Sequence, residues 1–220
     1  MAGLKSDITD YLNNISLDHL STYEDNKIQS EYIDSYFLKI NYAESEAAIV
    51  GKPQKQLWID FDVQGIQTTY KEILQIFSLL PPSKYSKWCD LGAGYGRLGI
   101  VLGLLHGECE FIGLELAEAR VKLGNQLFKD LELYNCNLQI VDIAAEEQML
   151  PRADVYFIYD FGTQEDVYKV INKLQNLALS KNIIVVARGR AVRRWILADY
   201  PWLSEVHQPE HYENWSIFYS

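Results

Sequence analysis

The chain has 220 residues, of which 48% are hydrophobic and 23% charged, so it fits one globular domain with an extension and excludes wholesale disorder. Thirty acidic against twenty basic side chains give a net charge of -10. This charge excludes bulk electrostatic binding to nucleic acid or to an anionic membrane unless a local basic patch overrides it. Three separated cysteines, a polar start and no apolar run of ~18 residues favour a reduced, cytoplasmic protein.

The first 64 residues are predicted to form a helical and extended segment ahead of a main domain at residues 65–220. Apolar side chains recur twice at helical spacing, at positions 8, 11, 12 and 15 and at positions 33, 36, 37 and 40. Alternating apolar residues at positions 57, 59, 61 and 63 indicate an extended stretch. The tyrosines before residue 45 could form a lid over a ligand or cover a sheet edge.

Strands and helices alternate in the main domain. Thr69 and Glu72 form a capping-box pattern that opens a helix, and Pro81 and Pro82 should close it. Strands are then predicted at residues 88–91, 110–115, 138–141, 155–159, 183–187, 203–208 and 215–219. This order predicts an α/β fold with a doubly wound, mostly parallel seven-stranded sheet and an antiparallel C-terminal strand.

The chemistry concentrates at residues 90–96, with the sequence DLGAGYG, between the first strand of the main domain and the next helix. Glycines at alternate positions allow a positive φ and let a ligand approach the backbone closely. The following helix begins at the carboxyl edge of the sheet, where open α/β sheets bind ligands. Glu115 ends the second strand and can accept hydrogen bonds from a ribose diol. Together these features predict a nucleoside-binding site.

Three functions are consistent with such a site. Gly94, Gly96 and Gly99 also satisfy the dinucleotide pattern GxGxxG, which would indicate an NAD-type oxidoreductase. However, Asp90 is a poor neighbour for a pyrophosphate, and the chain leaves little room for a separate substrate domain. The second alternative is a protein that uses a cofactor with a sulfonium and an amino group, and acidic neighbours suit this cofactor better. A non-catalytic nucleoside-binding protein, with a regulatory or interaction role, remains the third alternative.

Residues 90–96 resemble the first motif of the class I, seven-β-strand S-adenosylmethionine-dependent methyltransferases. Glu115 resembles the acid that ends their second strand, Asp142 the acid near the adenine, and residues 154–160 their fourth-strand motif. The resemblance covers residues 66–219. It implies S-adenosylmethionine as cofactor, methyl transfer as the activity, and an acceptor that the sequence does not identify.

Carried over residue by residue, the resemblance implies that Asp90 faces the methionine amino group and that the glycine backbone lines the methionine and ribose. Glu115 would hold the ribose hydroxyls, and Asp142 with Ile143 the adenine. The implied cofactor-binding residues are Thr68, Asp90, Gly92, Ala93, Gly94, Gly96, Glu115, Leu116, Asp142 and Ile143.

A narrower resemblance, to the telomeric-silencing type of protein-lysine methyltransferase, is carried by residues 65–69, 90–99 and 159–162. Those enzymes have Asn-Asn-Phe where this chain has Tyr159, Asp160 and Phe161. This resemblance would make the acceptor a protein side-chain nitrogen. With the acidic composition, a protein or a small molecule is favoured as acceptor over nucleic acid.

The candidate catalytic residues are Asp160 and Tyr159. Methyl transfer from a sulfonium needs a nucleophile held in line at ~3 Å and a route for its proton. Asp160 could take that proton or could cap the helix that begins near residue 163. Tyr159 could stack on the acceptor or simply finish a buried strand.

Two further groups of residues follow the fifth strand. The cluster Arg188, Arg190, Arg193 and Arg194 could bind an anionic acceptor group or form a solvated helix face. His207 and His211 are separated by Pro209, which breaks the helix that would put both on one face. No metal site is therefore predicted.

Overall fold

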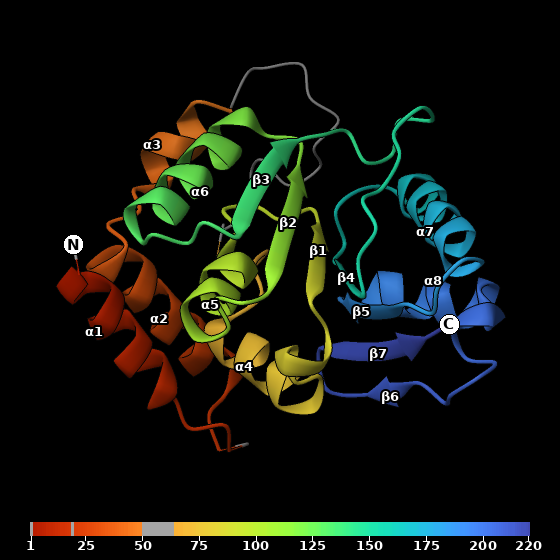
Figure 1. The fold of residues 1–220 in the computed structure, drawn as a ribbon, viewed down its shortest axis with the longest axis horizontal. Helices are drawn as coiled ribbons and strands as arrows, with labels where there is room; N and C mark the ends of the chain where they lie inside the picture. Colours follow the sequence, from red (N-terminus) through yellow and green to blue (C-terminus); the bar gives the residue numbers. More distant parts are fainter. Residues whose placement is uncertain (1, 19, 50–63) are drawn as a thin grey trace.

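The computed structural model describes residues 2–18, 20–49 and 64–220, and within them seven strands form one sheet (Figure 1). The strands are β1 (Lys87–Leu91), β2 (Glu110–Glu115), β3 (Cys136–Ile140), β4 (Val155–Ile158), β5 (Ile184–Arg188), β6 (Glu210–His211) and β7 (Trp215–Tyr219). Their order across the sheet is β3-β2-β1-β4-β5-β7-β6. The first five strands run parallel, and β7 is antiparallel to both β5 and β6. The predicted fold class is confirmed.

The α-helices of the described residues are α1 (Ala2–Asn13), α2 (Tyr23–Tyr32), α3 (Tyr42–Ala47), α4 (Tyr70–Leu79), α5 (Arg97–Leu105), α6 (Glu118–Asp130), α7 (Gln164–Ala178) and α8 (Arg190–Asp199). Of these, four precede β1, three connect parallel strands (α5, α6 and α7), and α8 follows β5. The predicted capping box opens α4, because the Thr69 side chain accepts from the Glu72 N–H and the Glu72 carboxylate accepts from the Thr69 N–H. None of the described helices is both long and apolar enough to cross a bilayer.

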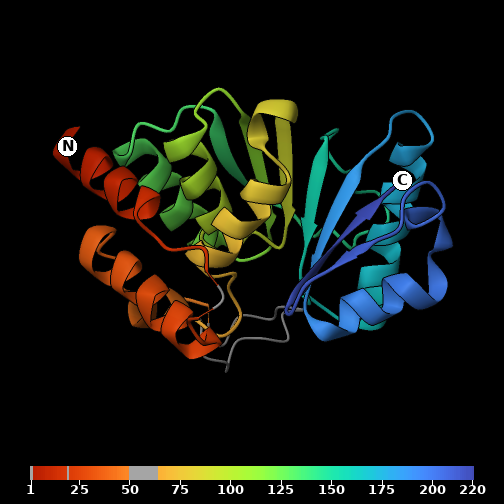
Figure 2. The same ribbon diagram turned by 90° about the horizontal axis from the view of Figure 1, so that it is seen from below.

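The sheet separates two hydrophobic cores. Successive strand residues point to opposite faces, so Trp88 packs with Phe111 and Phe157 in one cluster, while Cys89 and Tyr156 pack in the other. Helices α1, α4, α5 and α6 contribute to the first cluster, and α7 and α8 to the second. Figure 2 shows these two sets of helices on opposite faces of the twisted sheet. Because the helices change face between β1 and β4, a crevice is left at the carboxyl ends of these strands.

The N-terminal helices pack on the helices of the first face. Helix α1 contacts α5, α2 contacts α4, and α3 contacts α6, and α1 and α2 lie outermost in Figure 2. The helix predicted around residues 33–40 is longer than expected: it begins at Tyr23 behind a Thr22–Asp25 capping box and continues through a π-helical turn (Ile33–Phe37). The extension is therefore integrated with the layer that carries the glycine-rich turn.

The strand predicted at residues 203–208 is wrong. Pro201 starts a 3-10 turn (Pro201–Leu203) in which Leu203 is fully buried, whereas Val206 is 61% exposed. The sixth strand is instead Glu210–His211, paired with β7. Apolar residues at 203 and 206 reflect one buried anchor and one surface residue rather than a strand face. The extended stretch predicted at residues 57–63 lies outside the described residues.

Glycine also sets how closely α5 approaches the sheet. A Cβ at Gly99 would lie 2.5 Å from the Phe111 ring, so we expect Gly99→Ala to lower the free energy of unfolding by about 1–3 kcal/mol through overpacking. Gly3→Ala is the matched control, because nothing lies within 4 Å of its Cβ position, and it should be neutral or stabilising by up to ~1 kcal/mol. Urea unfolding followed by circular dichroism measures both; equal effects would contradict the packing argument.

Candidate functional site

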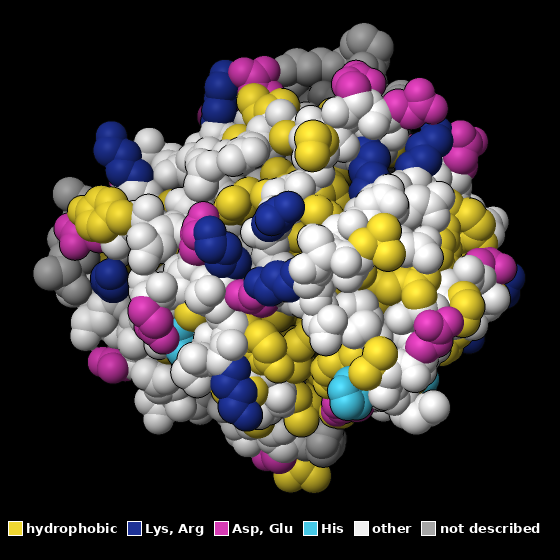
Figure 3. Space-filling view, turned by 45° about the vertical axis from the view of Figure 1, so that its right-hand side comes forward, with side chains coloured by type: hydrophobic (Ala, Val, Ile, Leu, Met, Phe, Trp, Pro, Cys, Tyr) yellow, Lys and Arg dark blue, Asp and Glu magenta, His cyan; other side chains and the backbone are white. Residues whose placement is uncertain are grey.

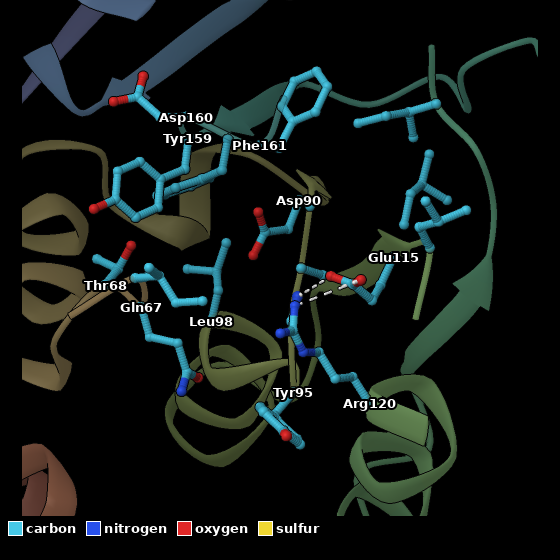
Figure 4. A pocket seen from close by; sticks show the side chains of 18 of the residues that line it. Gln67, Thr68, Asp90, Tyr95, Leu98, Glu115, Arg120, Tyr159, Asp160 and Phe161 are labelled. Carbon is cyan, nitrogen blue, oxygen red and sulfur yellow. Dashed lines mark hydrogen bonds and ion pairs between the residues drawn. The ribbon is translucent and has the colours of Figure 1, made fainter. Parts of the chain in front are cut away.

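A cleft lies at the carboxyl ends of β1, β2 and β4, where the helices change face. Its lining includes all the sequence-predicted site residues except Gly96: Thr68, Asp90, Gly92, Ala93, Gly94, Glu115, Leu116, Asp142, Ile143, Tyr159 and Asp160. Residues from the start of α4, the turn after β1, the end of β2 and the loops after β3 and β4 therefore meet at one place. Figure 4 shows many of these side chains converging on the cleft.

The turn after β1 needs glycine for two different reasons. Gly92, Gly94 and Gly96 all have positive φ angles, of 94°, 55° and 79°. A Cβ at Gly94 would meet nothing within 4 Å, so this glycine borders open cleft space. A Cβ at Gly96 would lie 2.7 Å from the Phe128 ring of α6. Gly96 is thus required for packing and for the start of α5, and it lies outside the cleft lining.

Asp90 is the most perturbed acid of the cleft. Its carboxylate points into the cleft (Figure 4). Burial, together with the negative charge of Glu115, raises the pKa of Asp90 to about 7. An acid held in such a place destabilises the free protein when it ionises, and a cationic ligand group would relieve the cost.

Glu115 joins the ends of β1 and β2. One carboxylate oxygen accepts from the Gly94 N–H at 2.9 Å and the other from the Ala117 N–H at 2.8 Å. The Arg120 guanidinium lies 3.9 Å away (dashed in Figure 4). The carboxylate is therefore held in one orientation at the cleft wall, and carboxylate oxygens have lone pairs for further donors such as hydroxyls.

At the loop after β3, Asp142 accepts from the Ala144 N–H at 3.1 Å. Ile143 is buried beside it, and both residues line the cleft. An acid next to an apolar side chain suits a flat ligand with polar edges.

Two arginines of the cleft wall were missed by the sequence analysis. Arg97 and Arg120 both line the cleft and are 4% and 5% exposed. Arg97 directly follows the glycine-rich turn, but its ion-pair partner, Asp34, is 63 residues away. Periodicity and motif spacing report only on residues that are close in the chain. They therefore contain no signal for the pairing of Arg97 with Asp34.

The residues after β4 form the opposite wall. Tyr159 is stacked on the Arg188 guanidinium, 4.5 Å from the ring centroid, and burial raises the pKa of its hydroxyl. Asp160 accepts from the Val192 N–H at 3.0 Å, and its carboxylate points away from Asp90 in Figure 4. Asp160 therefore caps α8. The alternative that Asp160 caps the helix near residue 163 is wrong, because Thr163 and Asp166 cap that helix themselves.

The arginine cluster after β5 is divided between core and surface. Arg188 is 5% exposed and pairs with Glu72 through two hydrogen bonds of 3.1 and 3.2 Å. Arg193 donates to the Ser216 hydroxyl and to two backbone carbonyls, whereas Arg190 and Arg194 are exposed. Only Arg190 and Arg194, two of the four arginines, therefore lie on a solvated helix face.

Outside the cleft, charges are mixed. Acidic and basic side chains are interspersed over the face seen in Figure 3. No group of three or more His, Cys, Asp or Glu that could hold a metal ion occurs within residues 2–18, 20–49 and 64–220. The three cysteines are buried and carry free thiols.

Comparison with known proteins identifies related folds. Residues 82–219 match a family model described as a methyltransferase domain. Among solved structures, the precorrin-6y C5,15-methyltransferase of Geobacter metallireducens has a TM-score of 0.51 and 15% identity over 72% of this chain and 90% of that one. The Escherichia coli protein yhhF has a TM-score of 0.50 and 15% identity over 66% and 82%. At these identities the likeness shows the fold alone.

Some of the other matches are longer proteins. An O-methyltransferase from neocarzinostatin biosynthesis, crystallised with S-adenosylmethionine, is 17% identical over 61% of this chain, with a TM-score of 0.47. The chain spans less than half the length of this and two other O-methyltransferases that it matches, 40–48%. No curated protein sequence matches the chain.

The raised pKa of Asp90 predicts a pH-dependent stability. The folded-state value of about 7 lies above the ordinary 3.8, so ionisation lowers the free energy of unfolding increasingly from about pH 4 to 7 and no further above pH 7. Asp90→Asn should therefore be more stable than the native chain at about pH 8, with the gap closing toward about pH 4.5. Urea unfolding at several pH values measures this gap.

Asp10→Asn is the control for this series, because Asp10 is an exposed residue of α1 and its substitution should leave the pH profile unchanged. A stability gap for Asp90→Asn that is the same at every pH would contradict the assignment.

Proposed function

Because the chain belongs to the class I S-adenosylmethionine-dependent methyltransferases, we propose that it transfers a methyl group from S-adenosylmethionine to an acceptor bound beside Tyr159. Residues 65–220 would form the catalytic domain. The observation that carries the proposal is the charge of the cleft. Its lining contains five carboxylates, Asp90, Glu115, Asp142, Asp160 and Asp166, and the two arginines described above.

The acidic lining fits a cationic donor. S-adenosylmethionine carries a sulfonium and an ammonium group, whereas a dinucleotide carries a diphosphate that these carboxylates would repel. The space at the Cβ position of Gly94 is open, and a ligand that lies directly against the protein backbone needs such space. These observations support a sulfonium nucleoside over the NAD-type alternative.

Each end of the donor then has residues to hold it. The Asp90 carboxylate would accept from the ammonium group, and the backbone of Gly92 and Gly94 would border the methionine. Glu115, already oriented by two backbone N–H groups, would accept from the ribose hydroxyls. Asp142 and Ile143 would hold the adenine, with Leu116, Ala93 and Thr68 as further lining.

When bound, the donor supplies a methyl group on an activated leaving group, so the protein mainly has to orient the acceptor in line. The wall on the acceptor side is largely apolar, with Leu98, Phe157 and Phe161 among its residues. Tyr159, held from behind by Arg188, would border the acceptor. Such a wall excludes water from the reacting atoms.

The acceptor is proposed only by class. The mixed surface charge and the acidic cleft favour a protein side chain or a small molecule over nucleic acid. A non-catalytic nucleoside-binding role is distinguished by experiment: the donor would bind, and no component of a cell extract would become labelled by S-adenosylmethionine carrying a radioactive methyl group.

A thermal-shift comparison tests the donor. S-adenosylhomocysteine at 100 times its dissociation constant should stabilise the chain by about 2.7 kcal/mol, whereas NADH should not. Gly94→Val should abolish this shift, because its side chain would enter the open space that the ligand occupies.

Gly3→Ala, far from the cleft, is the control and should keep the full ligand-induced shift. Stabilisation by NADH but not by S-adenosylhomocysteine would refute the proposal.

The role of Asp160 needs a pair of variants, because its carboxylate caps α8. Asp160→Asn keeps an oxygen for the Val192 N–H but removes a proton acceptor, whereas Asp160→Ala removes both. If Asp160 takes the acceptor's proton, both variants should bind S-adenosylhomocysteine and lose labelling of the extract by a factor on the order of 100 or more. Only Asp160→Ala should lose about 1 kcal/mol of stability. An Asp160→Asn variant with full labelling would leave Asp160 as a cap alone.

A further inference from the structure

Both arginines of the cleft obtain their counter-charge from the N-terminal helices. Arg97 and Arg120 are the only cations among the described residues that line the cleft. Each forms an ion pair with an acid from the first 49 residues: Asp34 for Arg97 and Glu46 for Arg120. In an otherwise acidic cleft, two unpaired arginines would oppose a cationic ligand.

The first pair is deeply buried. Asp34 is 1% exposed and accepts from Arg97, from the Tyr42 hydroxyl at 2.6 Å and from the Tyr70 hydroxyl at 2.8 Å. The other terminal nitrogen of Arg97 donates to the Thr68 carbonyl at 2.9 Å. Asp34 thus fixes Arg97 against the segment that enters α4, and this segment lines the cleft.

The second pair lies at the nucleoside end. Arg120 donates to both carboxylate oxygens of Glu46 at 2.8 Å, a bidentate geometry. The Tyr95 hydroxyl donates to the same carboxylate at 2.5 Å. Arg120 also lies 3.9 Å from Glu115 (Figure 4). Glu46 therefore shares the positive charge of Arg120 with the acid that would bind the ribose.

We propose that Asp34 and Glu46 are positioning residues of the donor site: they neutralise Arg97 and Arg120, so that the cleft keeps a negative charge for the cationic donor. The inference rests on the proposed function. It assigns to the N-terminal helices an electrostatic task in donor selection, in addition to packing. Neither acid lines the cleft, so both act through the arginines.

The charge of the ligand provides a readout that packing alone would not change. S-adenosylmethionine has a net charge of +1, and S-adenosylhomocysteine, which lacks the methyl group, is neutral overall. Loss of the Glu46 charge leaves Arg120 partly uncompensated, and this penalises the charged ligand more. At ~10 Å from the sulfonium and with an effective dielectric constant of ~20, one uncompensated unit charge on Arg120 changes the ratio of the two dissociation constants by a factor on the order of ten.

The experiment is calorimetric titration of the full chain with each ligand. Glu46→Gln, which keeps the side-chain length and one acceptor oxygen for Arg120 but removes the negative charge, should raise the dissociation constant of S-adenosylmethionine about tenfold more than that of S-adenosylhomocysteine. The double variant Glu46→Gln with Arg120→Gln removes both charges and should bring the ratio back toward the native value. Asp34→Asn tests the first pair, Asp34 with Arg97, in the same way if Glu46→Gln does not fold.

Glu118→Gln is the matched control, because it removes an exposed ion pair with Lys122 from the same helix and should leave the ratio unchanged. If Glu46→Gln raises the dissociation constants of both ligands equally, or raises neither, the inference is overturned while the proposed function stays intact. A native chain that binds neither ligand would instead refute the proposed function.

Discussion

The hydrogen bond from the Gly94 N–H to the Glu115 carboxylate determines the shape of the cleft. It joins the turn after β1 to the end of β2, at the point where the carboxyl ends of parallel strands meet. The turn can reach Glu115 because Gly92 and Gly94 adopt positive φ angles, which side chains with a Cβ rarely adopt. The hydrogen bond to Glu115 acts together with two others. The Gly92 and Ala93 N–H groups donate to the Leu114 carbonyl at 2.9 and 3.0 Å, and these bonds together hold the turn that leads into α5 against the end of β2.

The same geometry collects carboxylates in one place. Parallel strands β1 and β2 end side by side, so Asp90 is buried next to Glu115, and burial together with the negative charge of Glu115 raises the pKa of Asp90 to about 7. The buried negative charge lowers the free energy of unfolding, and packing elsewhere in the molecule has to offset this loss. Such a loss is typical of binding sites, because a ligand of opposite charge recovers it. The two cores on either side of the sheet supply the stability that makes the loss tolerable.

What the sequence could predict was local. The glycine-rich turn, the acids at strand ends and the Thr69–Glu72 capping box are set by neighbours in the chain, and they appear where the pattern placed them. The Glu46–Arg120 pair joins residues 74 positions apart, and the Asp160 carboxylate caps a helix that begins thirty residues later. No periodicity encodes such partners. The short β6 strand was also missed, because two residues are too few for an alternating pattern.

Long-range contacts also hold the wall after β4 in place. Asp160 is tied to α8, and Tyr159 is stacked on Arg188, which pairs with Glu72 at the start of α4. Glu72 in turn caps its own helix with Thr69, next to the cleft residue Thr68. One chain of contacts therefore links both walls of the cleft across β5. Because an in-line displacement tolerates little misplacement of the acceptor, a wall held by these contacts would suit the methyl transfer proposed above.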